Sequence, residues 1–208
     1  MNSPTEQIDK KELILIEAEK LFSEQDFDSV SVRDLAKAAN VNIAMISYYF
    51  GSKEKLFEAL IARRIESSHL ILRSLVTHEM SSCEKVNAVI DFYVDKLIDN
   101  RNVHRMMNRE LSITNRPHLR DLIMDKIRMN REFIKSLMEE GVRNKEFKAD
   151  MDIDMTIMNF FATLNHTVGA SYYSCDMFNK KNDEELFTPE FKERLKQYFK
   201  TLFTYNLL

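Results

Sequence analysis

The chain has 208 residues, of which 44% are hydrophobic and 30% charged, and its formal net charge is −3. A chain of this length and composition can bury a sizeable core, which excludes a disordered or fibrous protein. It contains only 3 glycines and 3 prolines, and this scarcity favours an all-α fold, because sheet-rich proteins use both residues heavily in turns.

The sequence contains no pattern that predicts catalysis. It has no glycine-rich phosphate loop, no nucleophile motif and no histidine pair at the spacing of metal ligands, so we expect no enzyme, cofactor or metal site. Cys83 and Cys175 are far apart and in neither metal nor redox spacing, which indicates a reducing, cytoplasmic setting, with thiol sensing as an alternative. No signal peptide or apolar run of transmembrane length occurs in the sequence.

The first 50 residues predict three helices. Ser3-Pro4-Thr5-Glu6 is a capping box with proline at the first helical position, so a helix is expected from there to about Gln25. Ser31 is a suitable N-cap for a second helix that ends at Asn40, a residue that tolerates the left-handed conformation. Asn42 can cap a third helix. Two short helices joined by so tight a turn are typical of a helix-turn-helix, whose second helix enters the DNA major groove.

The expected third helix has two distinct faces. Ile46 and Phe50 lie one turn apart and would pack on the core, whereas Ala44, Met45 and Tyr48 fall on the opposite face. Small residues near the helix start allow close approach to DNA, and Met45 could touch base edges or a thymine methyl group. Periodicity alone leaves open an ordinary helical hairpin within an all-α domain.

Longer helices are expected in the rest of the chain. Residues 52–78 form one uninterrupted pattern, which as a helix would span roughly 40 Å without a hinge at its start. Further helices are expected over residues 81–100, 102–113, 117–143, 150–174 and 189–206. The helix over residues 150–174 is apolar on every side, so we expect the core to cover one face and a partner subunit the other. The last helix carries an aromatic stripe that also needs a partner.

Several of these features together resemble the DNA-binding domain of the tetracycline-repressor family of bacterial regulators. The matching motifs are Leu35-Ala36, Asn40-Val41-Asn42, Tyr48-Tyr49-Phe50 and Ser52-Lys53-Glu54-Lys55-Leu56. Asn40 and Asp26 stand where the family usually has glycine, and both residue types can adopt positive φ. The resemblance implies a three-helix DNA-binding head over residues 1–52 and a helical effector-binding and dimerisation body over residues 53–208.

The resemblance also implies which residues contact DNA. Up to residue 55 the head holds seven basic and ten acidic residues, so a local arrangement rather than net charge must hold the DNA. Lys53 would reach a phosphate from the N-terminus of the fourth helix. Ile43 and Ser47 stand where the family often has a polar or basic residue and a tyrosine, which leaves the bases read open. The expected DNA-binding residues are Ser31, Arg33, Asn42, Ile43, Ala44, Met45, Ser47, Tyr48, Tyr49 and Lys53.

In the body, we expect an internal cavity for a small effector and, as the resemblance implies, a four-helix dimer interface. Methionine and aromatic side chains suit an adaptable apolar pocket, although at helical spacing they equally form an ordinary core. The candidate pocket residues are Phe92, Tyr93, Met106, Met107, Arg109, Glu110, Phe133, Phe161, Asn165 and His166. The candidate dimer-interface residues are Phe160, Leu164, Val168, Gly169, Tyr172, Leu195, Phe199, Leu202 and Phe203.

These features favour a homodimeric transcriptional repressor. Two recognition helices would enter successive major grooves of a palindromic operator, and a small apolar or amphipathic effector in the body would release the DNA. One alternative is a helix-turn-helix regulator that answers to a protein partner or to no ligand. An all-α enzyme is a third reading, which a test of DNA binding would separate from the other two.

Overall fold

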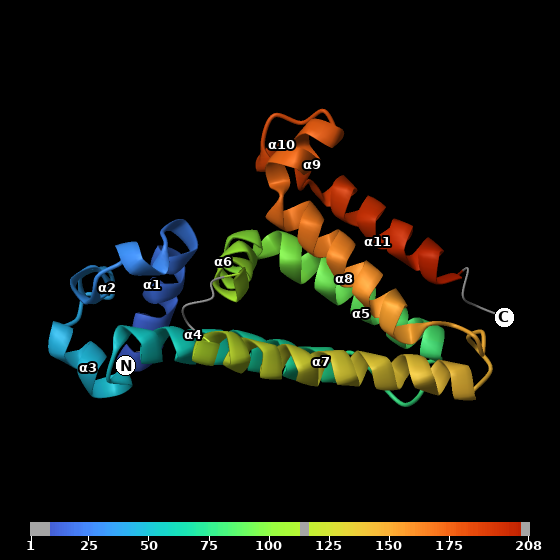
Figure 1. Cartoon of the computed structure of the whole chain (residues 1–208), viewed down its shortest axis with the longest axis horizontal. Coiled ribbons are helices and arrows are strands. Elements are labelled where there is room, and N and C mark those ends of the chain that lie inside the picture. The colour runs from blue at the N-terminus through green and yellow to red at the C-terminus, as the bar shows by residue number, and fades with distance from the viewer. Residues whose placement is uncertain (1–8, 113–116, 205–208) are drawn as a thin grey trace, which may run out of the picture.

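The computed structural model describes residues 9–112 and 117–204, and the regular structure in these residues is helical (Figure 1). The helices are α1 (Lys10–Glu24), α2 (Val32–Ala38), α3 (Ile43–Phe50), α4 (Lys53–Ser74), α5 (Ser82–Asp99), α6 (Arg101–Ser112), α7 (Pro117–Arg143), α8 (Ile153–Gly169), α9 (Ser171–Met177), α10 (Asp183–Leu186) and α11 (Pro189–Thr204). A 3₁₀ turn (Phe27–Ser29) lies between α1 and α2. None of the helices in this part of the chain has the length and apolar character needed to cross a membrane.

The head consists of α1, α2 and α3 packed on the first turns of α4. Phe22 of α1, Phe27 of the 3₁₀ turn and Phe57 of α4 are buried against one another, with ring centroids 4.9 to 5.5 Å apart. Since Phe57 belongs to the helix that continues into the body, the head and the body are joined by a rigid element rather than by a linker.

The head also shares its core with the body. Met106 of α6 and Leu119 and Ile123 of α7 are buried in the same cluster as the head residues. In Figure 1, α6 stands between α1 and the helices α5 and α8 of the body. The packing of the head therefore depends on α6 and α7 as well as on α4.

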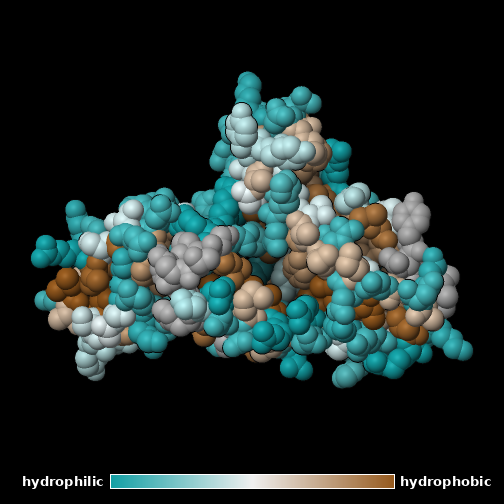
Figure 2. Space-filling model, viewed as in Figure 1, coloured by the Kyte–Doolittle hydropathy of each residue, from teal (hydrophilic) through white to brown (hydrophobic). Residues whose placement is uncertain are grey.

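The body has a second core in which α5 is surrounded by α7, α8 and α11. The ring of Phe160 from α8 lies 4.7 Å from that of Phe199 of α11 and 6.5 Å from that of Tyr93 of α5, centroid to centroid. Figure 1 shows α4 and α7 side by side along the length of the molecule, with α9 and α10 in a small lobe at the opposite side. Figure 2 shows a mostly hydrophilic face with hydrophobic patches over the head at left and over the end of the body at right.

Two helix boundaries differ from those expected, and one short helix is additional. α1 begins at Lys10, where the side chain of Asp9 caps it, whereas the Ser3–Glu6 capping box lies outside the described residues. α4 ends at Ser74 rather than near residue 78. The short helix α10 occupies part of a segment, residues 179–185, that was expected to be a polar loop.

The expected helix over residues 150–174 is broken in two. α8 ends at Gly169, and Ala170, with φ of −98° and ψ of 52°, turns the chain into α9. One of the carbonyl groups freed by the break, that of Val168, accepts a hydrogen bond from Arg105 Nε of α6 at 2.9 Å. The break is thus stabilised by a tertiary contact that satisfies an orphan acceptor, which hydrophobic periodicity cannot reveal.

Candidate DNA-binding surface and effector cavity

Local hydrogen bonds shape the helix-turn-helix. Ser31 and Asp34 form a reciprocal capping box at the start of α2, with N–H···O distances of 3.2 and 3.0 Å. The hydroxyl and the backbone N–H of Ser31 both donate to the Asp34 carboxyl and lower its pKa. Asn40 ends α2 with a φ of 50°, which confirms the left-handed residue expected there. Asn42 caps α3, as predicted, since its Oδ1 accepts from the second backbone N–H of that helix at 2.9 Å. Asp26, the other residue in place of glycine, has a φ of −65° and is not left-handed.

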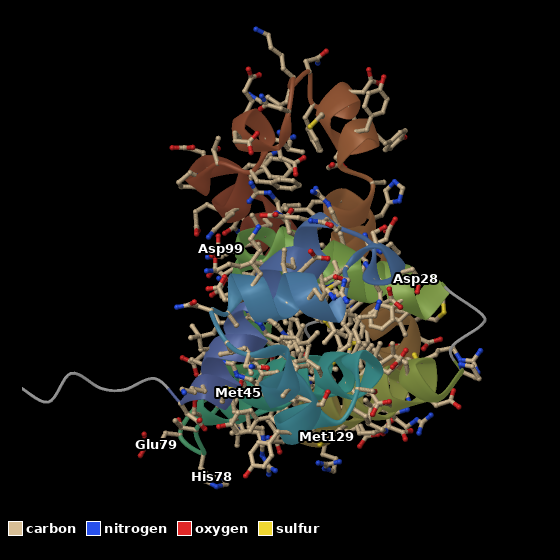
Figure 3. All side chains as sticks on the ribbon, turned by 90° about the vertical axis from the view of Figure 1, so that its left-hand side faces the viewer. Asp28, Met45, His78, Glu79, Asp99 and Met129 are labelled. Atoms are coloured by element: carbon tan, nitrogen blue, oxygen red, sulfur yellow. The ribbon has the colours of Figure 1, made fainter. Side chains whose placement is uncertain are left out.

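α3 turns one face to the core and the other to solvent. Ile46 is 1% exposed, whereas Tyr48 is 82% exposed. Tyr49 is half-buried and packs against the head core. Figure 3 looks at this end of the molecule and shows Met45 low on the head. Of the expected DNA-binding residues, Ser31, Arg33, Asn42, Ile43, Ala44, Ser47 and Tyr48 are exposed, and Met45, Tyr49 and Lys53 are half-buried.

Lys53 makes contacts within the head. Its amine donates hydrogen bonds to the carbonyl oxygens of Phe27 at 2.8 Å and Val30 at 2.9 Å, and it lies 4.2 Å from the centroid of the Phe27 ring. Lys53 therefore ties the turn between α1 and α2 to the start of α4. An ammonium group has three donors, so these two bonds leave one donor for a phosphate, and the DNA contact of Lys53 stays a prediction.

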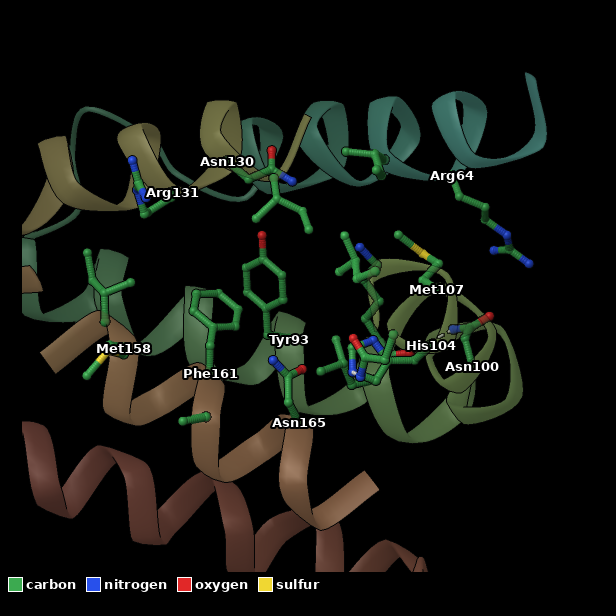
Figure 4. A pocket seen from close by; sticks show the side chains of 18 of the residues that line it. Arg64, Tyr93, Asn100, His104, Met107, Asn130, Arg131, Met158, Phe161 and Asn165 are labelled. Carbon is green, nitrogen blue, oxygen red and sulfur yellow. Dashed lines mark hydrogen bonds between the residues drawn. The ribbon is translucent and has the colours of Figure 1, made fainter. Parts of the chain in front are cut away.

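The body contains a cavity of about 820 Å³ between α4, α5, α6, α7 and α8 (Figure 4). Ligand pockets typically have volumes of about 300–1,000 Å³, so the cavity is large enough for a small organic molecule. Much of its wall is apolar and includes Ile65, Leu97, Met107, Ile157 and Phe161.

A chain of polar contacts crosses the cavity wall. Tyr93 of α5 points its hydroxyl toward Asn130 of α7 (Figure 4). His69 of α4 adjoins the same amide, with its Nδ1 2.7 Å from Asn130 Oδ1. Burial raises the pKa of the Tyr93 hydroxyl well above its ordinary value. Tyr93 therefore stays neutral and offers the cavity a hydroxyl rather than a charge.

Two basic side chains of the wall are affected by burial. Burial, together with the nearby charge of Arg64, lowers the pKa of Lys96 to about 8. Burial also lowers the pKa of His104 to about 4, although a hydrogen bond with Asn165 opposes this change. At neutral pH, His104 is therefore uncharged, whereas most Lys96 amines still carry a charge.

Comparison with known proteins identifies this combination of head and body. The family model described as "Bacterial regulatory proteins, tetR family" matches residues 14–60, and the one described as "Tetracyclin repressor-like, C-terminal domain" matches residues 79–169. The chain belongs to the TetR family of transcriptional regulators. Together the two matches reach from α1 to the end of α8 and so include both the helix-turn-helix and most of the cavity wall.

Individual relatives are similar along nearly the whole of this TetR-family protein. It is 23% identical over 202 residues to YttP, a probable HTH-type transcriptional regulator of Bacillus subtilis (strain 168), covering 94% of this chain and 95% of that protein. Its structure resembles the fatty acid degradation regulator FadR of Bacillus halodurans, with a TM-score of 0.74, 20% identity and coverage of 94% and 97%. It also resembles FadR of Bacillus subtilis in complex with stearoyl-CoA, with a TM-score of 0.67, 21% identity and coverage of 90% and 96%. These structural likenesses confirm the all-α fold.

Four of the ten residues expected at the effector pocket of this TetR-family protein line the cavity, namely Tyr93, Met107, Phe161 and Asn165. The six that lie outside its wall are Phe92, Met106, Arg109, Glu110, Phe133 and His166. Helix geometry explains the difference on α6, because successive residues turn by about 100° around the helix axis. His104 and Met107 thus face the cavity, while Met106 and Arg109 face the head.

Lys96, His104 and Asn130 also line the cavity, although the sequence did not predict a role for them there. Lys96 had a detectable signal, since it follows Tyr93 by three residues and precedes Leu97 on the apolar stripe of α5. A lysine within an apolar stripe is exceptional, because charged residues are rarely buried without a reason. His104 and Asn130 stand among other polar residues, and no comparable signal marks them.

Five of the nine residues expected at the dimer interface lie in the core of the protomer itself. Phe160, Leu164, Val168, Leu195 and Phe199 are buried in the core that surrounds α5, which leaves their side chains little surface for a second subunit. Of the other four expected residues, Gly169 and Tyr172 are exposed, and Leu202 and Phe203 are half-buried. The exposed apolar side chains of α8, α9 and α11 are Met155, Met158, Tyr172, Tyr173, Met177 and Tyr198.

Proposed function

We propose that this TetR-family protein is a homodimeric repressor that a small amphipathic ligand releases from a palindromic operator. The observation that carries the proposal is the position of α6. One face of this helix lines the cavity through His104 and Met107, and another buries Met106 in the core of the head. A ligand that changes the packing of α6 would therefore change the position of the recognition helix.

The exposed apolar side chains of α8, α9 and α11 support the proposed dimerisation. Tyr172 is 91% exposed, and Met155 and Met158 are 54% and 56% exposed. Apolar patches of this kind mark interaction surfaces in soluble proteins, and a two-fold dimer would cover the same patch on both subunits. Two recognition helices held about 34 Å apart would then enter successive major grooves of an inverted repeat.

Release of DNA would require energetic coupling between the effector cavity and the DNA-binding surface. A ligand that favours a dimer with wrongly spaced heads lowers operator affinity, typically by about 5- to 150-fold, and DNA lowers ligand affinity by the same factor. The cavity volume of about 820 Å³ and its largely apolar wall support an amphipathic ligand. The similarity to FadR of Bacillus subtilis, whose structure holds stearoyl-CoA, supports a molecule with an acyl chain.

The experiment that tests this function is selection of DNA by the purified full-length protein from a pool of random duplexes. We expect enrichment of an inverted repeat, bound by two protomers in sedimentation analysis of the complex. Failure to enrich any sequence would contradict DNA-binding regulation. If an operator is enriched but no acyl compound lowers the affinity of the protein for it, the alternative is favoured. In that case a protein partner, or no ligand at all, controls the regulator.

A further inference from the structure

The charged residues that line the cavity are balanced in pairs, with one exception. Lys135 of α7 pairs with Asp154 of α8 at 2.7 Å, and Arg131 of α7 pairs with the adjacent Glu132 at 2.8 Å. Arg64 of α4 pairs with Glu19 of α1. Among the residues that the structure describes, Lys96 of α5 is the lining cation for which no carboxylate lies within ion-pair distance.

The carboxylates nearest to Lys96 in sequence are engaged elsewhere. Asp95 pairs with Lys196 of α11 at 2.9 Å, and Asp99 pairs with Lys192 of α11 at 3.0 Å. These contacts lie on the side of α5 that packs against α11, opposite the cavity. The carboxylates of α5 therefore cannot neutralise Lys96 without giving up their own partners.

The amine of Lys96 lies among aromatic and uncharged polar side chains, and the one charge that acts on its pKa is that of Arg64, which Glu19 balances. The Lys96 amine lies 5.7 Å from the centroid of the Phe92 ring and 5.6 Å from that of Tyr93. The uncharged His104 of α6 is hydrogen-bonded within the wall, with its Nε2 3.1 Å from the Nδ2 of Asn108 on the same helix. A cation that is partly removed from water without a counter-ion is costly, and an anion entering the cavity would remove that cost.

We propose that the cavity binds an anionic amphipath, an acyl chain whose negatively charged group pairs with the Lys96 amine. The chain would lie along the apolar wall formed by Ile65, Leu97, Met107 and Phe161. The charged group can be the carboxylate of a free fatty acid or a phosphate of an acyl thioester of coenzyme A, since both offer oxygen acceptors to an ammonium group. The inference rests on the proposed function, because it assigns a ligand class and an anchoring residue to the same effector cavity.

The test measures binding of three probes to the full-length protein by calorimetry in the absence of DNA. The probes are dodecanoate, dodecanoyl-CoA and the neutral 1-dodecanol, which share one chain length and differ in charge. We expect at least one of the two anions to bind the wild type about 10- to 100-fold more tightly than the alcohol, as befits a charged hydrogen bond in a partly buried site. The anion that shows this preference identifies the source of the charge.

Substitutions then test Lys96 itself. Lys96→Met keeps the length of the aliphatic stem and removes the charge, so it should remove the preference for the anion and leave binding of 1-dodecanol unchanged. Lys96→Arg should retain the preference, because arginine stays charged. Lys135→Met removes a lining cation that Asp154 already balances, so its effect on anion affinity should be much smaller. A melting curve for each variant checks that the fold is intact.

Two results would overturn the inference: equal binding of the alcohol and both anions to the wild type, or unchanged anion binding by Lys96→Met. Release of DNA is measured separately with the selected operator. If the anion binds through Lys96 but leaves operator affinity unchanged, the ligand class stands and the proposed release mechanism fails. If 1-dodecanol binds as well as the anions and releases DNA, the release mechanism stands and the inference fails.

Discussion

Arg109 of α6 pairs with Asp26 in the head, with its Nη1 3.1 Å from the Asp26 Oδ1. The Nη2 of the same guanidinium donates to the backbone carbonyl oxygens of Phe22 and Gln25, both at 3.2 Å. These carbonyls lie at the end of α1, where the helix dipole favours a positive charge. Arg109 thus fastens α6, a wall of the cavity, to the first helix of the head.

Arg109→Ala is expected to weaken the coupling between ligand and DNA. Since Arg109 does not line the cavity, ligand affinity without DNA should stay within about twofold of the wild type, as for distant independent sites. The loss of operator affinity on ligand saturation should fall from the usual range of about 5- to 150-fold toward none. Fluorescence anisotropy with a labelled operator, with and without ligand, measures both quantities.

The control for this prediction is Arg128→Ala, because Arg128 is exposed and pairs with Asp125 on its own helix α7. It should behave as the wild type in both measurements. Full ligand-induced release by Arg109→Ala would show that α6 does not act through this contact.

The two faces of α3 should respond differently to substitution. Tyr48→Phe removes a hydroxyl from a side chain that is 82% exposed, so it should leave the free energy of unfolding within about 0.5 kcal/mol of the wild type and weaken operator binding. Ile46→Ala leaves a cavity in the core, because the Ile46 side chain is 1% exposed. It should destabilise the protein by about 2–5 kcal/mol. Urea denaturation and operator titration measure the two effects. Unchanged operator affinity of a folded Tyr48→Phe would remove its hydroxyl from the DNA contacts.

Lys53→Ala distinguishes a phosphate contact from a purely structural role. Loss of the bonds to Phe27 and Val30 should destabilise the head in either case. If Lys53 also contacts a phosphate, the slope of log affinity against log salt concentration should decrease by roughly 1. Measuring operator affinity between low and moderate salt gives this slope, and an unchanged slope would leave Lys53 with its structural role alone.

His104 makes the protein sensitive to acid. Its pKa is about 4 in the folded protein, against 6.5 as the ordinary value, so the unfolded chain takes up the proton first as pH falls. The stability that depends on neutral His104 is complete above pH 6.5 and is lost as pH falls toward 4. Between pH 7 and pH 4.5, the free energy of unfolding should therefore fall by about 2–3 kcal/mol less in His104→Gln than in the wild type. Urea denaturation at both pH values measures this difference, and His78→Gln, at an exposed position, should match the wild type.

Tyr198→Asp tests the face of α11 that the structure leaves exposed. Tyr198 is 51% exposed, so the substitution should not disturb the protomer, but at an apolar two-fold interface it would bury a charge on each subunit. We expect sedimentation velocity to show a shift from dimer to monomer. Leu70→Asp places the same charge at a side chain of α4 that is 69% exposed and should remain dimeric. A dimeric Tyr198→Asp would place the interface elsewhere.

The sequence determined the features that depend on hydrogen bonds between near neighbours in the chain. Ser31, Asn40 and Asn42 were identified as the capping and turn residues of the helix-turn-helix, because a cap or a left-handed residue acts within three or four positions of itself. The apolar face of α3, with Ile46 toward the core, followed from helical periodicity for the same reason. The all-α class followed from the scarcity of glycine and proline.

Only the tertiary structure decided which neighbour covers each apolar face. Phe160 and Leu164 are expected from the sequence to contact a partner subunit, but α5 covers them within the protomer. When a helix is apolar on every side, its sequence does not indicate which side packs on the core and which on a partner. The break after Gly169 and the direction of Arg109 likewise depend on partners more than 60 residues away in the chain. The unbalanced charge of Lys96 is visible only once α11 is seen to engage Asp95 and Asp99, because charge balance is a property of packed neighbours rather than of a sequence pattern.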